Sequence, residues 1–360
     1  MKYIDEYRDE AVVTKIISQI KKSSKQDITL MEVCGGHTMA IQKFGIPSLL
    51  PDNIHLVSGP GCPVCVTDRK YIDKAIALCR IPKVIITTYG DLIRVPGSSS
   101  TLDIEKSKGS DIRIVYSTLD ALDIAKKNPD KKIIFLGIGF ETTTPASAAA
   151  IFKARKENSF NFFLLSAHKV MPPAMTALIT EGVKINGYIC PGHVSVITGA
   201  GIYKDIAAEF KLACVISGFE PVDILQSIYM LVNQIENKKY SVEIQYNRVV
   251  QPGGNKKARQ LIQEVFEPRD DWWRGLGVIP KSGLSIRKKY EAFDANANFS
   301  IIVEETREPK GCICGEILKG LQKPFDCKLF GKSCTPSDPV GACMVSSEGS
   351  CAAFYKYHYK

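Results

Sequence analysis

Short apolar segments recur along the first 220 residues, each followed by a glycine-containing turn and then by a stretch with helical spacing. They occupy residues 28–33, 55–58, 84–88, 112–116, 133–138, 162–166, 187–190 and 213–217. Continuous apolar runs of this length that alternate with helices are typical of buried parallel strands. The pattern therefore predicts an α/β fold with doubly wound parallel sheets.

The last four segments repeat the spacing of the first four. Measured between the starts of matching segments, the offsets are 105, 107, 103 and 101 residues. We therefore expect two similar α/β domains, residues 1–125 and 126–240, followed by a third domain over residues 241–360. After residue 311 the chain is rich in Cys, Gly, Pro and Ser. A segment with so few apolar residues usually folds around a metal or disulfides.

Composition narrows the functional classes. Hydrophobic residues make up 45% of the 360 residues and charged residues 24%, which excludes a disordered or fibrous chain. No apolar run approaches the ~18 residues that span a bilayer, and the first residues lack the apolar core of a signal peptide. We expect a cytoplasmic protein. The net charge is +9 without a basic patch interleaved with aromatic residues, so nucleic acid is not an expected partner.

Twelve cysteines are many for a cytoplasmic protein, where thiols more often serve as metal ligands or redox groups than as structural disulfides. Six lie in the last 49 residues. Three others, Cys34, Cys62 and Cys65, lie in glycine-rich turns, whereas Cys79, Cys190 and Cys214 have apolar neighbours typical of core thiols.

The unusual motifs lie at the predicted carboxyl ends of strands, where open parallel α/β sheets bind their ligands. They are CGGHT at 34–38, GPGCPVC at 59–65, GFETT at 139–143 and PGHVS at 191–195. The cysteines of GPGCPVC form a C-x-x-C at a helix start, which indicates redox or metal chemistry. Cys34, with His37 one turn later, is either a nucleophile with a nearby base or a soft metal ligand.

Two further polar residues in these motifs have open roles. Glu141 is expected to open a helix, where a carboxylate either stabilises the helix or serves a site. His193, in a Pro-Gly turn, is either a structural hydrogen-bonding group or a catalytic one. We expect both to face a cleft between the two α/β domains and to matter for group transfer.

Four tail cysteines are separated by 14, 6 and 16 residues: Cys312, Cys327, Cys334 and Cys351. Such a set suits zinc or a cubane iron–sulfur cluster, and the absence of close C-x-x-C pairs favours the cluster. Cys314 and Cys343 remain as a spare pair. In an extended C-x-C, Cys314 would point away from a cluster bound by Cys312.

Taken together, these motifs closely resemble the HypD family of [NiFe]-hydrogenase maturation factors. The resemblance covers nearly the whole chain and includes the four strand-end motifs, the 14–6–16 cysteine spacing and GACMVSSEG at 341–349. It implies two similar α/β domains plus a third that carries a [4Fe–4S] cluster. It also implies a scaffold that, with the small protein HypC, holds Fe(II) while two cyanides and one carbonyl are added. HypE, carrying a thiocyanate group made with HypF, would donate the cyanide.

The resemblance also assigns residues. Cys34 would bind iron together with a HypC thiol, and Cys62 and Cys65 would form a thiol/disulfide pair close to that metal. Cys314 and Cys343 would form a second redox-active or disulfide pair. The cluster would be held by Cys312, Cys327, Cys334 and Cys351. We expect a monomer in the absence of its partners.

Two functions of other classes remain open. One is a disulfide reductase that resembles ferredoxin–thioredoxin reductase, in which a cluster reduces the C-x-x-C for another protein. The other is a structural scaffold with a zinc-bound tail. A brown chromophore would distinguish cluster from zinc, and iron retained with HypC would distinguish scaffold from reductase.

Overall fold

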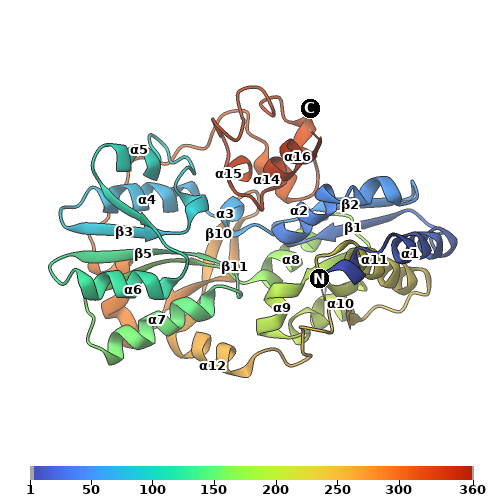
Figure 1. Cartoon of the computed structure of the whole chain (residues 1–360), viewed down its shortest axis with the longest axis horizontal. Helices are drawn as coiled ribbons and strands as arrows, with labels where there is room; N and C mark the ends of the chain where they lie inside the picture. The colour runs from blue at the N-terminus through green and yellow to red at the C-terminus, as the bar shows by residue number, and fades with distance from the viewer. Residues whose placement is uncertain (1–3, 359–360) are drawn as a thin grey trace.

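All eight expected strands are present in the computed structural model, which describes residues 4–358 (Figure 1). They are β1 (Ile28–Glu32), β2 (Ile54–Ser58), β3 (Val84–Thr88), β4 (Asp111–Ile114), β5 (Lys132–Gly139), β6 (Phe162–His168), β7 (Gly187–Pro191) and β8 (Ala213–Ser217). The α/β class and its parallel sheets are confirmed.

The strands form two separate parallel sheets. The first has the order β2-β1-β7-β8-β9, where β9 (Val242–Ile244) was not expected, and the second has the order β4-β3-β5-β6. The chain therefore begins in the first sheet, builds the whole second sheet and returns. The division expected at residue 125 does not match this arrangement, because it falls within the second sheet. Regular spacing revealed the strand–helix units, but strand pairing depends on contacts between residues far apart in the sequence, such as Leu30 opposite Gly187.

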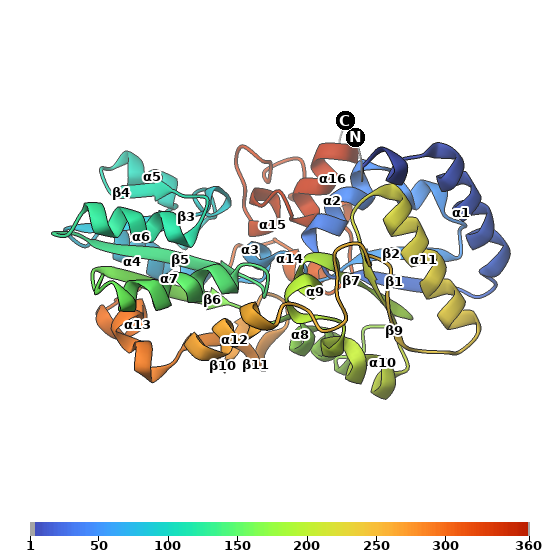
Figure 2. The ribbon, with the colours of Figure 1, turned by 60° about the horizontal axis from the view of Figure 1, so that its bottom comes forward.

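Helices cover both faces of each sheet, as expected for parallel strands. The first sheet packs against α1 (Glu10–Ser23), α2 (Gly35–Lys43) and α11 (Pro221–Glu236) on one face and against α8 (Met171–Thr180) and α10 (Lys204–Phe210) on the other. The second sheet lies between α4 (Arg69–Cys79) and the pair α6 (Thr118–Lys127) and α7 (Thr144–Lys156). Figure 2 shows the two halves side by side.

Sequence pattern explains these helices locally. In α1, the Asp9 carboxylate accepts a hydrogen bond from the Val12 amide at 2.9 Å and caps the first turn. Ile16 and Ile20 are four residues apart, so they share the face that is buried against the sheet.

An antiparallel hairpin, missed from the sequence, extends the second half. Strands β10 (Phe266–Trp273) and β11 (Gly277–Ile286) lie along the β6 edge, where the Ser166 hydroxyl donates to the Leu284 carbonyl at 2.8 Å. The sequence of β10, FEPRDDWW, contains proline and four charged residues, so it lacks the apolar run that marks the other strands. Helix α12 (Lys256–Val265) precedes the hairpin.

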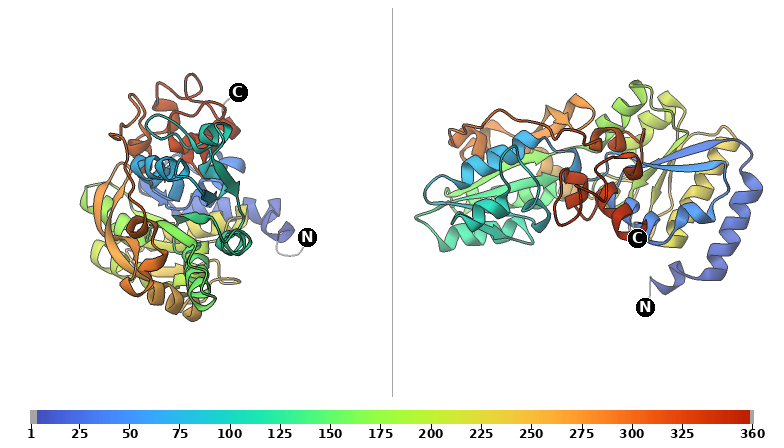
Figure 3. Two further views of the ribbon diagram at one scale, coloured as in Figure 1. Left: turned by 90° about the vertical axis from the view of Figure 1, so that its left-hand side faces the viewer. Right: turned by 90° about the horizontal axis from the view of Figure 1, so that it is seen from above.

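The cysteine-rich tail lies over the junction of the two halves (Figures 1 and 3). It contains α14 (Cys314–Leu318), α15 (Ala342–Val345) and α16 (Ser350–His358). One buried apolar core runs from the α4 side of the second sheet, through the tail, to the α8 side of the first. Within residues 4–358, no helix is both long enough and apolar enough to cross a bilayer.

Candidate functional site

A cleft of about 260 Å³ opens where the carboxyl ends of strands from both sheets meet. Its walls include Cys34 after β1, Asp91 after β3, Phe140 after β5 and His193 after β7. Thr142 and Thr143 line it as well. The structure therefore brings three of the strand-end motifs, with Gly61, Pro63 and Val64 of the fourth, to one place.

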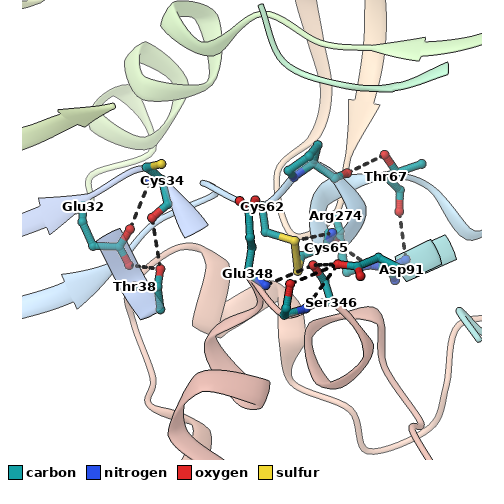
Figure 4. Close-up of a disulfide and its surroundings, with 12 residues drawn as sticks. Glu32, Cys34, Thr38, Cys62, Cys65, Thr67, Asp91, Arg274, Ser346 and Glu348 are labelled. Atoms are coloured by element: carbon teal, nitrogen blue, oxygen red, sulfur yellow. Dashed lines mark hydrogen bonds between the residues drawn. A yellow bond between two sulfur atoms is a disulfide. The ribbon is translucent and has the colours of Figure 1, made fainter. Parts of the chain in front are cut away.

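Cys34 lies between β1 and the first turn of α2, with its side chain partly buried (Figure 4). The Gly35 amide donates to the Gly61 carbonyl at 3.1 Å, which holds the CGGHT and GPGCPVC loops together. A Cβ on Gly61 would overlap the backbone of Val33 and Cys34, so this close approach requires glycine.

Burial raises the pKa of the Cys34 thiol to about 12, and the nearby carboxylates Glu348 and Glu32 contribute. Backbone N–H groups of Gly36 and His37 act in the opposite direction. Cys34 is therefore a thiol at neutral pH, and its ionisation requires a cation close to the sulfur. Metal coordination supplies this charge and deprotonates a thiol. The electrostatics thus suit a metal ligand better than a free nucleophile.

Cys62 and Cys65 form a disulfide, with Cα atoms 5.2 Å apart, at the start of α3 (Pro63–Val66). The Cys65 amide donates to the Cys62 sulfur at 3.1 Å. Both residues are buried and do not line the cleft, but their neighbours in the chain, Gly61, Pro63 and Val64, do. Figure 4 shows the disulfide between Cys34 and Arg274.

Two acidic residues of the cleft were given no role from the sequence, although Asp91 lies just after an expected strand. Glu348 lines the cleft, and burial followed by the charge of Asp91 raises its pKa. The Asp91 carboxylate accepts hydrogen bonds from the Ser346 hydroxyl at 3.1 Å and the Ser347 amide at 3.3 Å (Figure 4). These bonds attach the loop of the tail to the second half. Glu348 lies within GACMVSSEG, but nothing in that motif indicates which strand end it approaches.

His193 and His37 stack on opposite sides of Phe219, with ring centroids 4.1 and 4.6 Å from it. His193 lines the cleft, as expected. His37 does not: its buried Nε2 faces the carbonyls of Ser217 at 3.3 Å and Gly218 at 3.0 Å. Carbonyls only accept, so Nε2 carries the proton. Burial lowers the pKa of His37 to about 4, so the ring is neutral and supports the site rather than acting as a base for Cys34.

Glu141 was expected to open a helix and face the cleft, and both expectations are wrong. Helix α7 begins at Thr144, and the buried Glu141 carboxylate instead accepts the Met171 amide of α8 at 3.1 Å. Its other oxygen, Oε2, has no partner in the described part of the chain. Burial, the main cause, raises the pKa of Glu141 to about 7. Sequence placed the residue at a strand end, but the fold turns its side chain toward the start of α8.

Glu141→Gln is expected to change the pH dependence of stability. The pKa of Glu141 is about 7 in the folded protein against 4.5 ordinarily, so the wild type loses stability as pH rises from about 4.5 to 7. Glutamine does not titrate and still accepts from Met171. The difference in free energy of unfolding, variant minus wild type, should therefore rise by about 2 kcal/mol between pH 5 and pH 8. Anaerobic unfolding curves at both pH values measure this gain. Glu209→Gln, on the exposed face of α10, is the control, and a Glu141→Gln profile parallel to wild type would contradict the prediction.

Five tail cysteines surround one narrow cavity: Cys312, Cys314, Cys327, Cys334 and Cys351. The proximity of Cys314, followed by burial, raises the pKa of both Cys312 and Cys351, and burial raises that of Cys334. A bound cationic centre would stabilise the thiolate forms, which burial and the neighbouring cysteines disfavour. Cysteine donors around one cavity fit an iron–sulfur cluster, which takes one thiolate per iron. Within residues 4–358, no three His, Cys, Asp or Glu side chains are arranged around a common metal-ion position.

Cys314 does not point away from Cys312, contrary to expectation. The two sulfurs are 3.3 Å apart, and both cysteines line the cavity. The alternation of side chains applies to an extended strand, whereas α14 begins at Cys314. Cys343 is buried, lies outside the cavity lining, and is not bonded to Cys314.

Arg274, in the turn of the β10–β11 hairpin, connects the disulfide with the cysteine cavity. Its side chain donates to the carbonyls of Cys65 and Thr67, each at 3.0 Å. Its positive charge also lowers the pKa of Cys312, although other effects outweigh this one. Next to it, Gly275 packs on the backbone of Gly315, where a Cβ would come within 2.6 Å of the Gly315 oxygen. The unexpected hairpin therefore fixes the disulfide loop against the tail.

Comparisons with known proteins agree over nearly the whole chain. A model of the HypD family, described as "Hydrogenase formation hypA family", matches residues 11–358. A putative hydrogenase expression/formation protein of Methanocaldococcus jannaschii is 46% identical over 97% of this chain and 98% of its own length. Hydrogenase maturation factor HypD of Rhizobium leguminosarum bv. viciae is 46% identical over 99% and 96%, and that of Azotobacter vinelandii is 44% identical over 99% and 97%.

Proposed function

The chain belongs to the HypD family of hydrogenase formation proteins, and from this premise we propose that it is a scaffold for assembling the iron centre of [NiFe]-hydrogenase. With HypC, it holds Fe(II) as a substrate while two cyanides and one carbonyl are added. The observation that carries the proposal is the cleft itself. Cys34, the wall of the disulfide loop, His193 and Glu348 converge there from both halves and the tail.

Cys34 is the protein ligand of this iron, shared with a HypC thiol. Soft thiolates suit low-spin Fe(II), which cyanide and carbonyl stabilise. The raised pKa of Cys34 supports the assignment, since the sulfur keeps its proton until a metal cation arrives. Glu348 and Asp91 also line the cleft, and the charge of Glu348 is close enough to raise the pKa of Cys34, so a cation bound beside that sulfur would be stabilised.

The reduced form of Cys62 and Cys65 supplies electrons for cyanide release. HypE presents the cyanide as a thiocyanate, R–S–C≡N. When its S–C bond breaks, two electrons come from the dithiol as the Cys62–Cys65 bond forms, and the two thiol protons leave with the carrier sulfur and the cyanide. Cyanide then loses its proton as it binds iron. This role is supported by the disulfide lying in the loop whose Gly61, Pro63 and Val64 line the cleft together with Cys34.

Cys312, Cys327, Cys334 and Cys351 would hold a [4Fe–4S] cluster, which would supply single electrons to restore the dithiol. The proximity of the disulfide loop to the tail supports this role: Arg274 holds the loop through the Cys65 and Thr67 carbonyls, and its neighbour Gly275 packs on Gly315 of the tail. A cytoplasmic location and a monomeric state in the absence of HypC and HypE complete the proposal.

A disulfide reductase is the second candidate, favoured by one observation. Arg274 donates to the carbonyl of Cys65 and is near enough to Cys312 for its charge to lower the pKa of that thiol, so the disulfide loop and the cysteine cavity are close, as electron transfer to any disulfide substrate would also require. Iron analysis of the anaerobically purified complex with HypC separates the two. The scaffold retains one iron beyond the cluster iron, whereas a reductase retains none.

Cys62 and Cys65 are expected to titrate together as a two-electron couple, because C-x-x-C at a helix start closes reversibly. Protein equilibrated in graded redox buffers and then alkylated should change by two adducts in a single transition, measured by mass spectrometry. Cys62→Ser is the matched control: Cys65 should then be alkylated at every potential. Independent modification of the two thiols in the wild type would reject the couple.

A further inference from the structure

A second pocket lies at the β6 edge of the second sheet, apart from the cleft. It is enclosed by the start of α4, the end of β6, strand β10 and Asn296, and it shares no lining residue with the cleft. Its volume is about 110 Å³. A single water needs ~10–15 Å³, so the pocket has room for a small polyatomic ligand.

Positive charge dominates the lining. Four cationic side chains line the pocket with two carboxylates, an excess of two positive charges in the lining: Lys70, Lys74, Lys169 and Arg269 against Asp68 and Asp271. Asp294, outside the lining, offsets part of this excess at Lys74 and Arg269. The Asp68 carboxylate already caps α4 by accepting the Lys70 amide at 2.9 Å. The amide groups at the start of α4 therefore already interact with a carboxylate. The excess positive charge of the pocket comes from the lysine and arginine side chains that line it.

Lys169 is the buried element of the site, with its side chain only 2% exposed. Its ammonium donates to the Asp271 carboxylate at 2.8 Å and to the Trp272 carbonyl at 2.7 Å, and it lies 5.1 Å from the centre of the Trp273 ring. A lysine so enclosed cannot turn toward solvent, so its charge is fixed at the pocket.

Arg269 has a donor without an acceptor. Its Nη2 donates to the Ser166 carbonyl at 3.0 Å and lies 3.6 Å from the Asp271 carboxylate. Its Nε is buried and has no partner within residues 4–358. An unpaired buried N–H of a guanidinium costs free energy unless a ligand accepts it.

Lys70 and Lys74 complete the cationic side from one face of α4, four residues apart. Lys74 donates to the Asn296 side chain at 2.9 Å. Burial lowers the pKa of Lys74, and the charges of Lys70 and Arg269 lower it further, partly offset by Asp294 and Asp68. The cations therefore repel one another across the pocket, and a bound anion would relieve this repulsion.

We propose that this pocket binds a small doubly charged oxyanion of the phosphate class. Its size, the excess of cations in its lining and the unpartnered Arg269 Nε together favour this ligand. Arginine binds such oxyanions through fixed, directional N–H groups, and lysine adds point charge. The inference does not depend on the proposed function, because no residue of the pocket lines the cleft or the cysteine cavity.

Isothermal titration of the full chain with inorganic phosphate at low ionic strength tests the site. Wild type should show saturable binding at one site. Arg269→Lys keeps the charge but loses Nε–H, and should weaken binding ~10-fold or more. The double variant Lys70→Met/Lys74→Met, on the outer side of α4, should weaken it about 3-fold or more. Lys106→Met, an exposed lysine on α5 (Leu102–Ser107), is the matched control and should bind as wild type.

Three outcomes would overturn the proposal. The first is the absence of saturable binding in wild type. The second is an unchanged affinity in the double variant, which decides the matter even if Arg269→Lys fails to fold. The third is displacement of phosphate by formate at equal concentration, which would show that the pocket does not select a doubly charged oxyanion.

Discussion

Under the scaffold proposal, Cys34→Ala should abolish the iron held together with HypC while leaving the fold and the cluster iron in place. Cys34 lines the cleft, and no other cysteine in the described part of the chain does so. Loss of an outer partner of a metal ligand already costs 10–100-fold in affinity, so loss of the ligand itself should cost more. Iron analysis of the complex, with cluster iron determined separately from its absorbance, measures the effect.

Cys79→Ala is the matched control for this experiment. Cys79 is a buried thiol of α4, where its sulfur donates to the Ile76 carbonyl at 3.0 Å, far from the cleft lining. That variant should keep both kinds of iron. If Cys34→Ala retained the additional iron, Cys34 would not be the ligand, and the scaffold assignment would lose its central residue.

Alanine at any of Cys312, Cys327, Cys334 or Cys351 should remove most of the thiolate-to-iron absorbance. A cubane cluster has one cysteine ligand per iron, so each of these variants would leave one iron without a protein ligand. The tail folds around the cysteine cavity, so it should also become accessible to protease in the same variants. Absorbance spectra of anaerobically purified variants and limited proteolysis measure the two effects.

The structure sharpens this experiment, because five thiols surround the cavity and a cubane needs four. One thiol should therefore be dispensable, and the 14–6–16 spacing assigns that role to Cys314. Cys314→Ala and Cys343→Ala should both keep the chromophore, with Cys343 as the control outside the cavity lining. A colourless Cys314→Ala protein, together with a coloured quartet variant, would overturn the assignment.

The sequence was sufficient to predict the eight parallel strands and to predict that the motifs after them would lie close together. Each of the eight strands could be recognised in the sequence as an apolar run. The parallel strands of one sheet have their carboxyl ends at the same edge of that sheet. Cys34, the GPGCPVC loop and His193 could therefore be expected at a common cleft. Strand pairing could not be predicted, because similar apolar runs allow several orders. β3 and β4 joined β5 and β6 rather than β1 and β2.

Other features depend on side-chain direction or on contacts across most of the chain. Glu141 and His37 occupy the expected turns, yet Glu141 binds the start of α8 and His37 faces the Ser217 and Gly218 carbonyls. Glu348 lines the cleft from a loop that is hydrogen-bonded to Asp91, over 250 positions earlier in the chain. The β10–β11 hairpin could not be recognised from the sequence, because β10 lacks an apolar run. Arg274, in its turn, donates to the Cys65 carbonyl of the disulfide loop. These contacts join residues that are far apart in the sequence, so they cannot be predicted from the residues on either side of each one.

The infrared spectrum of the wild-type complex with HypC, purified anaerobically after supply of cyanide through HypE, tests the central claim most directly. The scaffold proposal predicts bands in the cyanide and carbonyl stretching region that are present in wild type and in Cys79→Ala and missing from Cys34→Ala. A wild-type complex that holds its [4Fe–4S] cluster and its HypC partner, yet shows no band in that region, would contradict the proposal.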